Sequence, residues 1–165
     1  MNRTEADRWL EGAVKAYGDQ LLRLCFLYLH DRHLAEDAVQ ETFLRAYKAY
    51  VRFRGDSSEK TWLTRIAVNV CRDMLRTAWF RRLDRRITPE ELALTAPAPE
   101  EPALAEAILR LPVRDREVIL LRYYEQLTPE AIARVLHTPL NTVKSRLARA
   151  KKKLRQTLEG WCDDA

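Results

Sequence analysis

The sequence is poor in the residues that several common classes of protein depend on. It contains only four glycines, and no apolar run approaches the roughly 20 residues that a membrane-spanning helix requires. The three cysteines, Cys25, Cys71 and Cys162, form no closely spaced pair, which argues against a disulfide framework or a zinc knuckle. The polar first residues lack the apolar stretch of a secretory signal. We therefore expect a cytoplasmic protein without direct membrane insertion.

The chain is instead rich in apolar residues that recur at three- and four-residue spacing, and no segment alternates in the manner of a strand. This pattern predicts an all-α fold. The expected helices are about Glu5–Tyr17, Asp19–His30, His33–Tyr50, Ser58–Phe80, Ala103–Arg110, Val113–Tyr124, Pro129–Leu136 and Thr142–Glu159.

A change of composition divides the chain in two. Residues 84–102 contain four prolines and five acidic residues, and proline disfavours helical geometry in the residue before it. We expect this Pro/Ala/Glu-rich segment to be a linker between two small helical domains, residues 1–83 and 103–165.

Positive charge is concentrated near the C-terminus. Between Asn141 and Arg155 there are seven basic residues and no acidic ones, whereas an ordinary solvated face mixes the two signs. Thr128 is a good N-cap with Pro129 at the first helical position, and a second helix capped by Asn141 would follow the break at 137–139. A short helix, a turn and a longer basic helix are typical of a helix-turn-helix that enters the major groove of DNA.

The same basic helix has an apolar face that should pack inward: Val143, Leu147, Ala150, Leu154 and Leu158. That face argues against the alternative of a basic helix lying on a membrane surface. The residues expected to contact DNA are Asn141, Thr142, Lys144, Ser145, Arg146 and Arg149.

A polar face with an apolar edge lies on the third expected helix. Asp37, Gln40, Glu41 and Leu44 fall at helical spacing, which suits a basic protein partner. An ordinary solvated face would show the same spacing.

The fourth expected helix combines a core side with a basic stripe. Its core side is Leu63, Ile66, Ala67, Val70 and Met74, and its stripe is Thr61, Arg65, Asn69, Arg72 and Arg76. An amide among guanidiniums suits unpaired bases and their phosphates, and nearby aromatic rings can stack on those bases. The aromatic candidates are Phe53, Trp62, Trp79 and Phe80, although a tryptophan such as Trp62, taken singly, is more often a core residue than a stacking surface.

These motifs resemble two regions of a known family. The blocks DAVQETF (37–43), FRGDS (53–57) and TWLTRIAVN (61–69) resemble region 2 of bacterial sigma factors of the extracytoplasmic-function (ECF) group within the sigma-70 family. The segments 111–124, TPEAIA (128–133) and NTVKSRL (141–147) resemble region 4.

The resemblance implies a division of labour along the chain. The face matching Asp37, Gln40, Glu41 and Leu44 would dock on the coiled coil of the largest subunit of core RNA polymerase, and the C-terminal helix would face the −35 element of promoter DNA. Ala148 stands where some relatives carry a larger side chain, so the resemblance does not fix the bases contacted there. An anti-sigma factor, in some relatives membrane-anchored, is a further implied partner. The resemblance places these residues at the melted −10 element: Phe53, Arg54, Asp56, Ser57, Trp62, Arg65, Asn69, Arg72 and Arg76.

Two other classes of function compete with this interpretation. His30, His33 and Glu36 could be imagined as metal ligands of an enzyme, but no Glu-x-x-His pair from a facing helix accompanies them. A stand-alone transcription regulator could use the helix-turn-helix without polymerase. We assign no catalytic residue, cofactor or metal to the chain.

Overall fold

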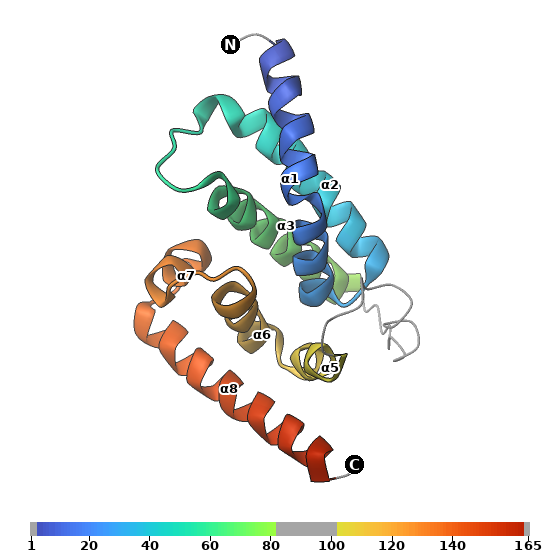
Figure 1. Cartoon of the computed structure of the whole chain (residues 1–165), viewed down its shortest axis with the longest axis vertical. Coiled ribbons are helices and arrows are strands. Elements are labelled where there is room, and N and C mark those ends of the chain that lie inside the picture. The colour runs from blue at the N-terminus through green and yellow to red at the C-terminus, as the bar shows by residue number, and fades with distance from the viewer. Residues whose placement is uncertain (1–2, 82–101, 164–165) are drawn as a thin grey trace. The chain divides into compact units, whose positions relative to one another are not determined.

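The computed structural model describes residues 3–81 and 102–163 (Figure 1). All regular structure in these two ranges is helical, which confirms the expected all-α fold. The chain separates into two compact units, Met1–Ala96 and Pro97–Ala165, here called the N-terminal and C-terminal units. The expected linker at 84–102 lies outside the described residues except for Pro102, which begins a helix.

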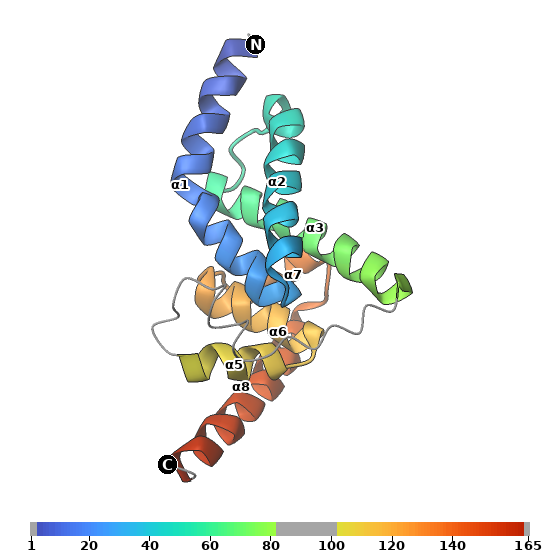
Figure 2. The same ribbon diagram turned by 90° about the vertical axis from the view of Figure 1, so that its right-hand side faces the viewer.

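The N-terminal unit consists of α1 (Arg3–Leu29), α2 (Arg32–Ala49), a short 3-10 helix η1 (Tyr50–Arg52) and α3 (Glu59–Arg81). Helices α1 and α2 run antiparallel, and α3 crosses them (Figures 1 and 2). The prediction of two helices separated at Gly18 is wrong, because α1 continues through that residue. A single helical glycine costs only about 1 kcal/mol relative to alanine, and burial of Ala13 and Leu21 on either side offsets that cost.

The reversal between α1 and α2 is built from local polar contacts. His30 takes a positive φ of 61°, and its amide still donates to the Phe26 carbonyl at 2.8 Å. Asp31 then caps α2, because its carboxylate accepts a hydrogen bond from the Leu34 amide at 3.0 Å. The predicted break between two helices near residues 31–32 is therefore confirmed.

The core of the N-terminal unit lies where the three helices meet. Small residues of α2, such as Ala35, Ala38 and Ala46, are fully buried and let the neighbouring helices approach closely. The predicted core side of α3 is confirmed for Leu63, Ala67 and Val70. The buried face of α3 is wider than predicted, because it also includes Thr64, Val68 and Cys71.

The C-terminal unit consists of α5 (Pro102–Arg110), α6 (Val113–Ile119), a π-helical segment η2 (Leu120–Tyr124), α7 (Pro129–Leu136) and α8 (Leu140–Asp163). The predicted helix at 113–124 is therefore an α-helix that changes to π geometry after Ile119. The buried Arg116 joins α5 to α6, because its guanidinium donates to the carbonyls of Leu109 and Leu111 at 2.8 and 3.1 Å.

The helix-turn-helix is formed by α7 and α8. The Thr128 side chain caps α7 by accepting from the Ala131 amide at 3.2 Å, as predicted, and His137 ends the helix with a φ of 49°. The predicted cap at Asn141 is wrong. Helix α8 begins at Leu140, so Asn141 lies inside the helix, and the Val143 amide donates a hydrogen bond to the Pro139 carbonyl at 3.1 Å.

The inner face of α8 packs on the rest of the unit as predicted. Val143, Leu147 and Ala150 are buried, whereas Leu154 and Leu158 are half-buried. Within the described ranges, no helix is both long enough and apolar enough to span a bilayer.

Candidate nucleic-acid interface

A hollow of about 400 Å³, lined by polar and charged residues, lies at the N-terminal end of α8. Five of the six residues predicted to contact the −35 element line it: Asn141, Thr142, Ser145, Arg146 and Arg149. The sixth, Lys144, is exposed on the same helix. Arg114, in the first turn of α6, also lines the hollow and was not predicted from the sequence.

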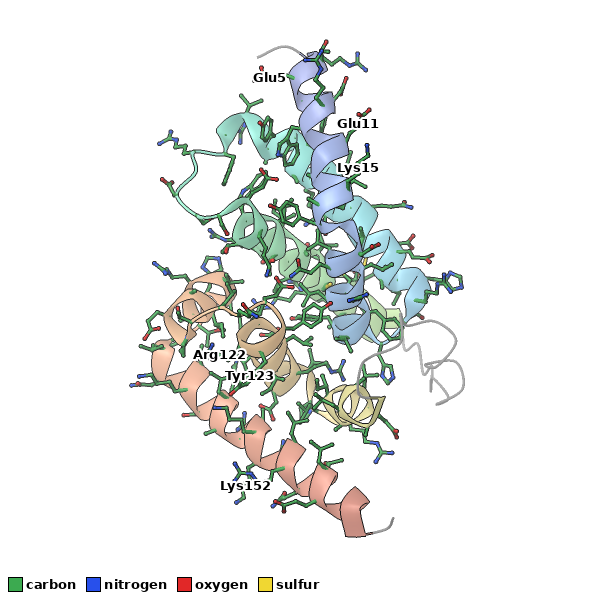
Figure 3. All side chains as sticks on the ribbon, viewed as in Figure 1. Glu5, Glu11, Lys15, Arg122, Tyr123 and Lys152 are labelled. Carbon is green, nitrogen blue, oxygen red and sulfur yellow. The ribbon has the colours of Figure 1, made fainter. Side chains whose placement is uncertain are left out.

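The basic helix also carries cations away from the hollow. Lys152 extends from the outer side of α8 (Figure 3) and is exposed. Lys151 lies over the ring of Tyr123, with its Nζ 5.4 Å from the ring centroid. The cationic surface therefore extends along α8 beyond the residues at its N-terminal end.

One buried carboxylate holds two of these cations. Asp115, the third residue of α6, is 1% exposed, and its Oδ1 accepts from Arg149 Nη2 at 2.8 Å and from Arg149 Nε at 3.2 Å. Its Oδ2 accepts from Lys153 Nζ at 3.0 Å. Burial by itself would raise the pKa of Asp115, but the hydrogen bonds and charges of Arg149 and Lys153 outweigh burial and hold the pKa below its ordinary value of 3.8.

An aromatic cluster occupies one end of the N-terminal unit. Phe53 stacks on Trp62 with a centroid distance of 4.7 Å, and Trp9 stacks on Tyr50 at 4.2 Å. Trp9 also lies 5.9 Å from Trp62, and its Nε1 donates to Glu59 at 3.1 Å. Trp62 is half-buried in this cluster and so lies between the two alternatives raised for it. The side chains of Trp79 and Phe80 lie outside the described residues.

The loop between η1 and α3 begins at Phe53 and is exposed from Arg54 to Ser58. Gly55 has a φ of 74°, a backbone conformation that residues with a Cβ atom rarely adopt. Ser58 caps α3, since its Oγ accepts from the Thr61 amide at 3.1 Å. The loop therefore presents the predicted Arg54, Asp56 and Ser57 to solvent between two anchored ends.

The predicted basic stripe runs along α3. Arg65 and Arg76 are exposed, whereas Thr61, Asn69 and Arg72 are half-buried. An acidic residue interrupts it, because Asp73 pairs with Arg76 at 3.5 Å and with Arg45 of α2 at 3.1 Å.

The predicted protein-docking face lies on α2. Asp37 and Gln40 are exposed, and Leu44 leaves 48% of its surface uncovered. Glu41 is half-buried and accepts from Arg45 Nε at 2.7 Å. The face thus presents an apolar side chain beside polar ones and is only in part acidic.

Sequence reasoning missed several residues of these sites, among them Trp9, Tyr50, Arg114 and Asp115. Trp9 lies 50 residues before its partner Glu59, and no periodicity links it to the loop. Asp115 likewise lies 34 residues before Arg149 in the sequence, and no periodicity links the two. The one available signal was an acidic residue in the first turn of a helix, which favours the positive helix end but names no partner.

The alternative metal site has no geometric support. Across the described part of the chain, no three His, Cys, Asp or Glu side chains come together in a way that could hold an ion, and this includes His30, His33 and Glu36.

Comparison with known proteins identifies both units. Residues 13–81 match the family model for sigma-70 region 2, and residues 102–154 match the model for sigma-70 region 4. The RNA polymerase sigma-H factor of Pseudomonas aeruginosa is 33% identical, over 88% of this chain and 84% of that protein. The ECF RNA polymerase sigma factor SigW of Bacillus subtilis is 31% identical, over 88% of this chain and 86% of that protein.

Solved structures agree with the sequence comparisons. CnrH, solved in complex with the cytosolic domain of CnrY, superposes with a TM-score of 0.69 at 28% identity, covering 93% of this chain and 90% of CnrH. The Bartonella quintana sigma factor RpoE, solved with the anti-sigma factor NepR, shares the fold with a TM-score of 0.74 at 22% identity, over 90% of this chain and 96% of RpoE. The chain therefore belongs to the sigma-70 family and, within that family, to the ECF sigma factors.

Proposed function

We propose that this ECF sigma factor binds core RNA polymerase and directs transcription from specific promoters, without catalysing a reaction itself. The observation that supports this proposal is the presence of regions 2 and 4 in order on one chain, at 13–81 and 102–154. A stand-alone regulator would need only the second of them. The chain would act in the cytoplasm, where polymerase and promoters are found.

The two domains then divide the promoter between them. Residues 1–83 would dock on the polymerase and capture the melted −10 element, and residues 103–165 would bind the −35 duplex. The hollow on α8 supports the −35 assignment, because Arg114, Arg146 and Arg149 supply cations around the neutral side chains of Asn141 and Ser145. Such a surface can hold phosphates at its rim and bond to base edges within the major groove.

The −10 assignment rests on the loop and the aromatic cluster. The stacked Phe53 and Trp62 form an aromatic surface beside an exposed loop, and the half-buried Asn69 lies on the same helix as Trp62. Aromatic rings stack on unpaired bases of any sequence, and an amide can bond to a base edge. Arg65 and Arg76 are exposed on that helix and would hold the strand's phosphates.

The α2 face would dock on the coiled coil of the polymerase's largest subunit. The exposed Leu44 supplies an apolar contact of the kind found at protein interfaces, and Asp37 and Gln40 supply polar contacts around it. An anti-sigma factor is the second protein partner we propose. CnrH was solved with the cytosolic domain of CnrY and RpoE with the anti-sigma factor NepR, and these complexes support such a partner for this chain.

The test is to mix the purified chain with bacterial core RNA polymerase, look for a complex by size exclusion, and then transcribe genomic DNA fragments. We expect co-elution and discrete start sites that polymerase alone does not produce. A chain that ignores polymerase yet shifts duplex DNA would instead be a stand-alone regulator.

A further inference from the structure

A negative charge buried beside a DNA-binding surface is unexpected in electrostatic terms. Attraction between cations and phosphates supplies much of the affinity of proteins for DNA, and a carboxylate opposes it. Asp115 nevertheless pairs with two cations of α8: Arg149, which lines the hollow, and Lys153. Its contribution must therefore be something other than affinity.

The geometry of the Arg149 contact shows what that contribution is. A guanidinium has two edges that can donate a pair of parallel hydrogen bonds. Asp115 takes the inner edge, formed by Nε and Nη2, at 3.2 and 2.8 Å. The outer edge, formed by Nη1 and Nη2, belongs to a side chain that is 56% exposed and lines the hollow.

The surroundings keep the carboxylate itself fixed. Asp115 is in the first turn of α6 with 2% of its side chain exposed, and Lys153 holds its second oxygen at 3.0 Å. Arg149 and Lys153 are one helical turn apart on α8, so both reach the same carboxylate. The carboxylate therefore sets the direction in which Arg149 points.

We propose that Asp115 is a positioning residue for promoter recognition: it orients Arg149 so that the outer edge of its guanidinium meets the edge of a guanine of the −35 element. The inference rests on the proposed binding of the −35 element by α8. A long arginine side chain loses conformational freedom when it binds a base, and a buttress that restricts it beforehand reduces that loss. The negative charge of Asp115 thereby weakens the sequence-independent attraction to phosphates, while the orientation that it gives Arg149 increases sequence selectivity.

The experiment uses the holoenzyme and duplex fragments that span start sites mapped with it. Affinity is measured for each fragment and for the same fragment with a scrambled −35 element, and the ratio of the two affinities is the selectivity. We expect Asp115→Asn to lower the selectivity roughly five- to tenfold, because an unbuttressed Arg149 contacts correct and incorrect bases more equally. Binding to the scrambled fragment should become more dependent on salt, by up to about one unit of the log–log slope, because one negative charge is gone.

Glu106→Gln is the matched control. This substitution also removes one negative charge from the C-terminal unit, but the Glu106 carboxylate pairs with the exposed Arg110 and not with a residue of the hollow. It should leave selectivity and salt dependence unchanged. Arg149→Ala should lower selectivity at least as much as Asp115→Asn. The double variant should lose no more than Arg149→Ala does alone, because the two residues act through one contact.

The possible results separate the inference from the function on which it rests. If Arg149→Ala lowers selectivity and Asp115→Asn does not, the positioning role is wrong while the −35 assignment stands. If neither variant changes selectivity, the assignment of Arg149 to the −35 element is itself wrong, and the inference falls with it.

A measurement on the unsubstituted chain covers the case in which Asp115→Asn fails to fold. The Nε–H signal of Arg149 in a nitrogen–proton NMR spectrum, identified through its loss in Arg149→Lys, should exchange with solvent more slowly than that of an unpaired exposed arginine. Exchange as fast as that of the unpaired arginine would show that Asp115 does not hold Arg149 in solution.

Discussion

At the scale of single residues, Asp115 also links the stability of the C-terminal unit to pH. Its pKa lies below the ordinary value of 3.8 because Arg149 and Lys153 favour the charged form. A carboxyl whose pKa is lowered by folding contributes stability that is fully present above its unfolded pKa. That contribution is lost as the pH falls through the folded value.

Asp115→Asn should therefore lower the free energy of unfolding at pH 7 by about 1.5–3 kcal/mol, the range for hydrogen bonds to charged groups. The difference in the free energy of unfolding between the two proteins should narrow as the pH falls below 3.8, because the carboxyl of the unsubstituted chain then takes up a proton and, like the asparagine, carries no charge. Urea unfolding followed by circular dichroism at several pH values measures this gap. A gap of constant size down to the acid limit would mean that the charge of Asp115 contributes no stability.

The buried cysteines give a second prediction at this scale. Cys25 and Cys71 are 0% and 1% exposed, and the contact with Cys25, followed by burial, raises the pKa of the Cys71 thiol. Both effects keep the thiol protonated, and the thiolate is the reactive form. In a Cys162→Ser background, we expect no labelling by iodoacetamide in the native state and labelling of both thiols in denaturant. Rapid labelling without denaturant would contradict the packing of α1 against α3.

At the scale of elements, the sequence predicted helices well and their boundaries less well. Pro129–Leu136 was predicted to the residue, because an N-cap threonine, a proline at the first position and the break at 137–139 all lie in or directly beside the helix. The break at Gly18 and the cap at Asn141 were wrong. In both places the local residue permits an end, and packing along the rest of the helix decides against it.

A pair of glycine substitutions tests the continuity of α1. Gly18→Ala should raise the free energy of unfolding by about 0.5–1 kcal/mol, since alanine favours a helix interior and the new Cβ would meet only Val14, at 3.8 Å. Gly55→Ala should instead lower it by about 1 kcal/mol, because the φ of 74° there is strained for alanine. Thermal unfolding of the two variants provides the comparison. A Gly18→Ala variant less stable than the unsubstituted chain would restore the two-helix interpretation.

At the scale of the whole molecule, what could be predicted was the order of the parts. Motif blocks in α2, α3, α7 and α8 were enough to indicate both units, because each block combines turn chemistry, apolar spacing and charge within a few residues. Contacts between distant segments were beyond that reasoning. The hydrogen bonds between Trp9 and Glu59 and between Arg149 and Asp115 depend on which faces of two helices meet. The spacing of residues along one helix does not specify those faces.

The division of labour between docking and promoter opening is the prediction at this largest scale. Leu44→Asp replaces the apolar side chain of the proposed docking face with a charge and should weaken binding to core polymerase at least tenfold, because burying an unpaired charge in an interface is unfavourable. Asn69→Ala should leave co-elution unchanged and reduce opening of the −10 element, because the amide is proposed to bond to an unpaired base only after docking.

Reactivity of unpaired thymines toward permanganate measures that opening in the same samples in which co-elution is measured. If Asn69→Ala abolished co-elution, α3 would belong to the docking surface, and the two functions assigned to the N-terminal unit would share one face. If Leu44→Asp left co-elution intact, the exposed leucine would have to serve another partner, and the proposed anti-sigma factor would be the first to test.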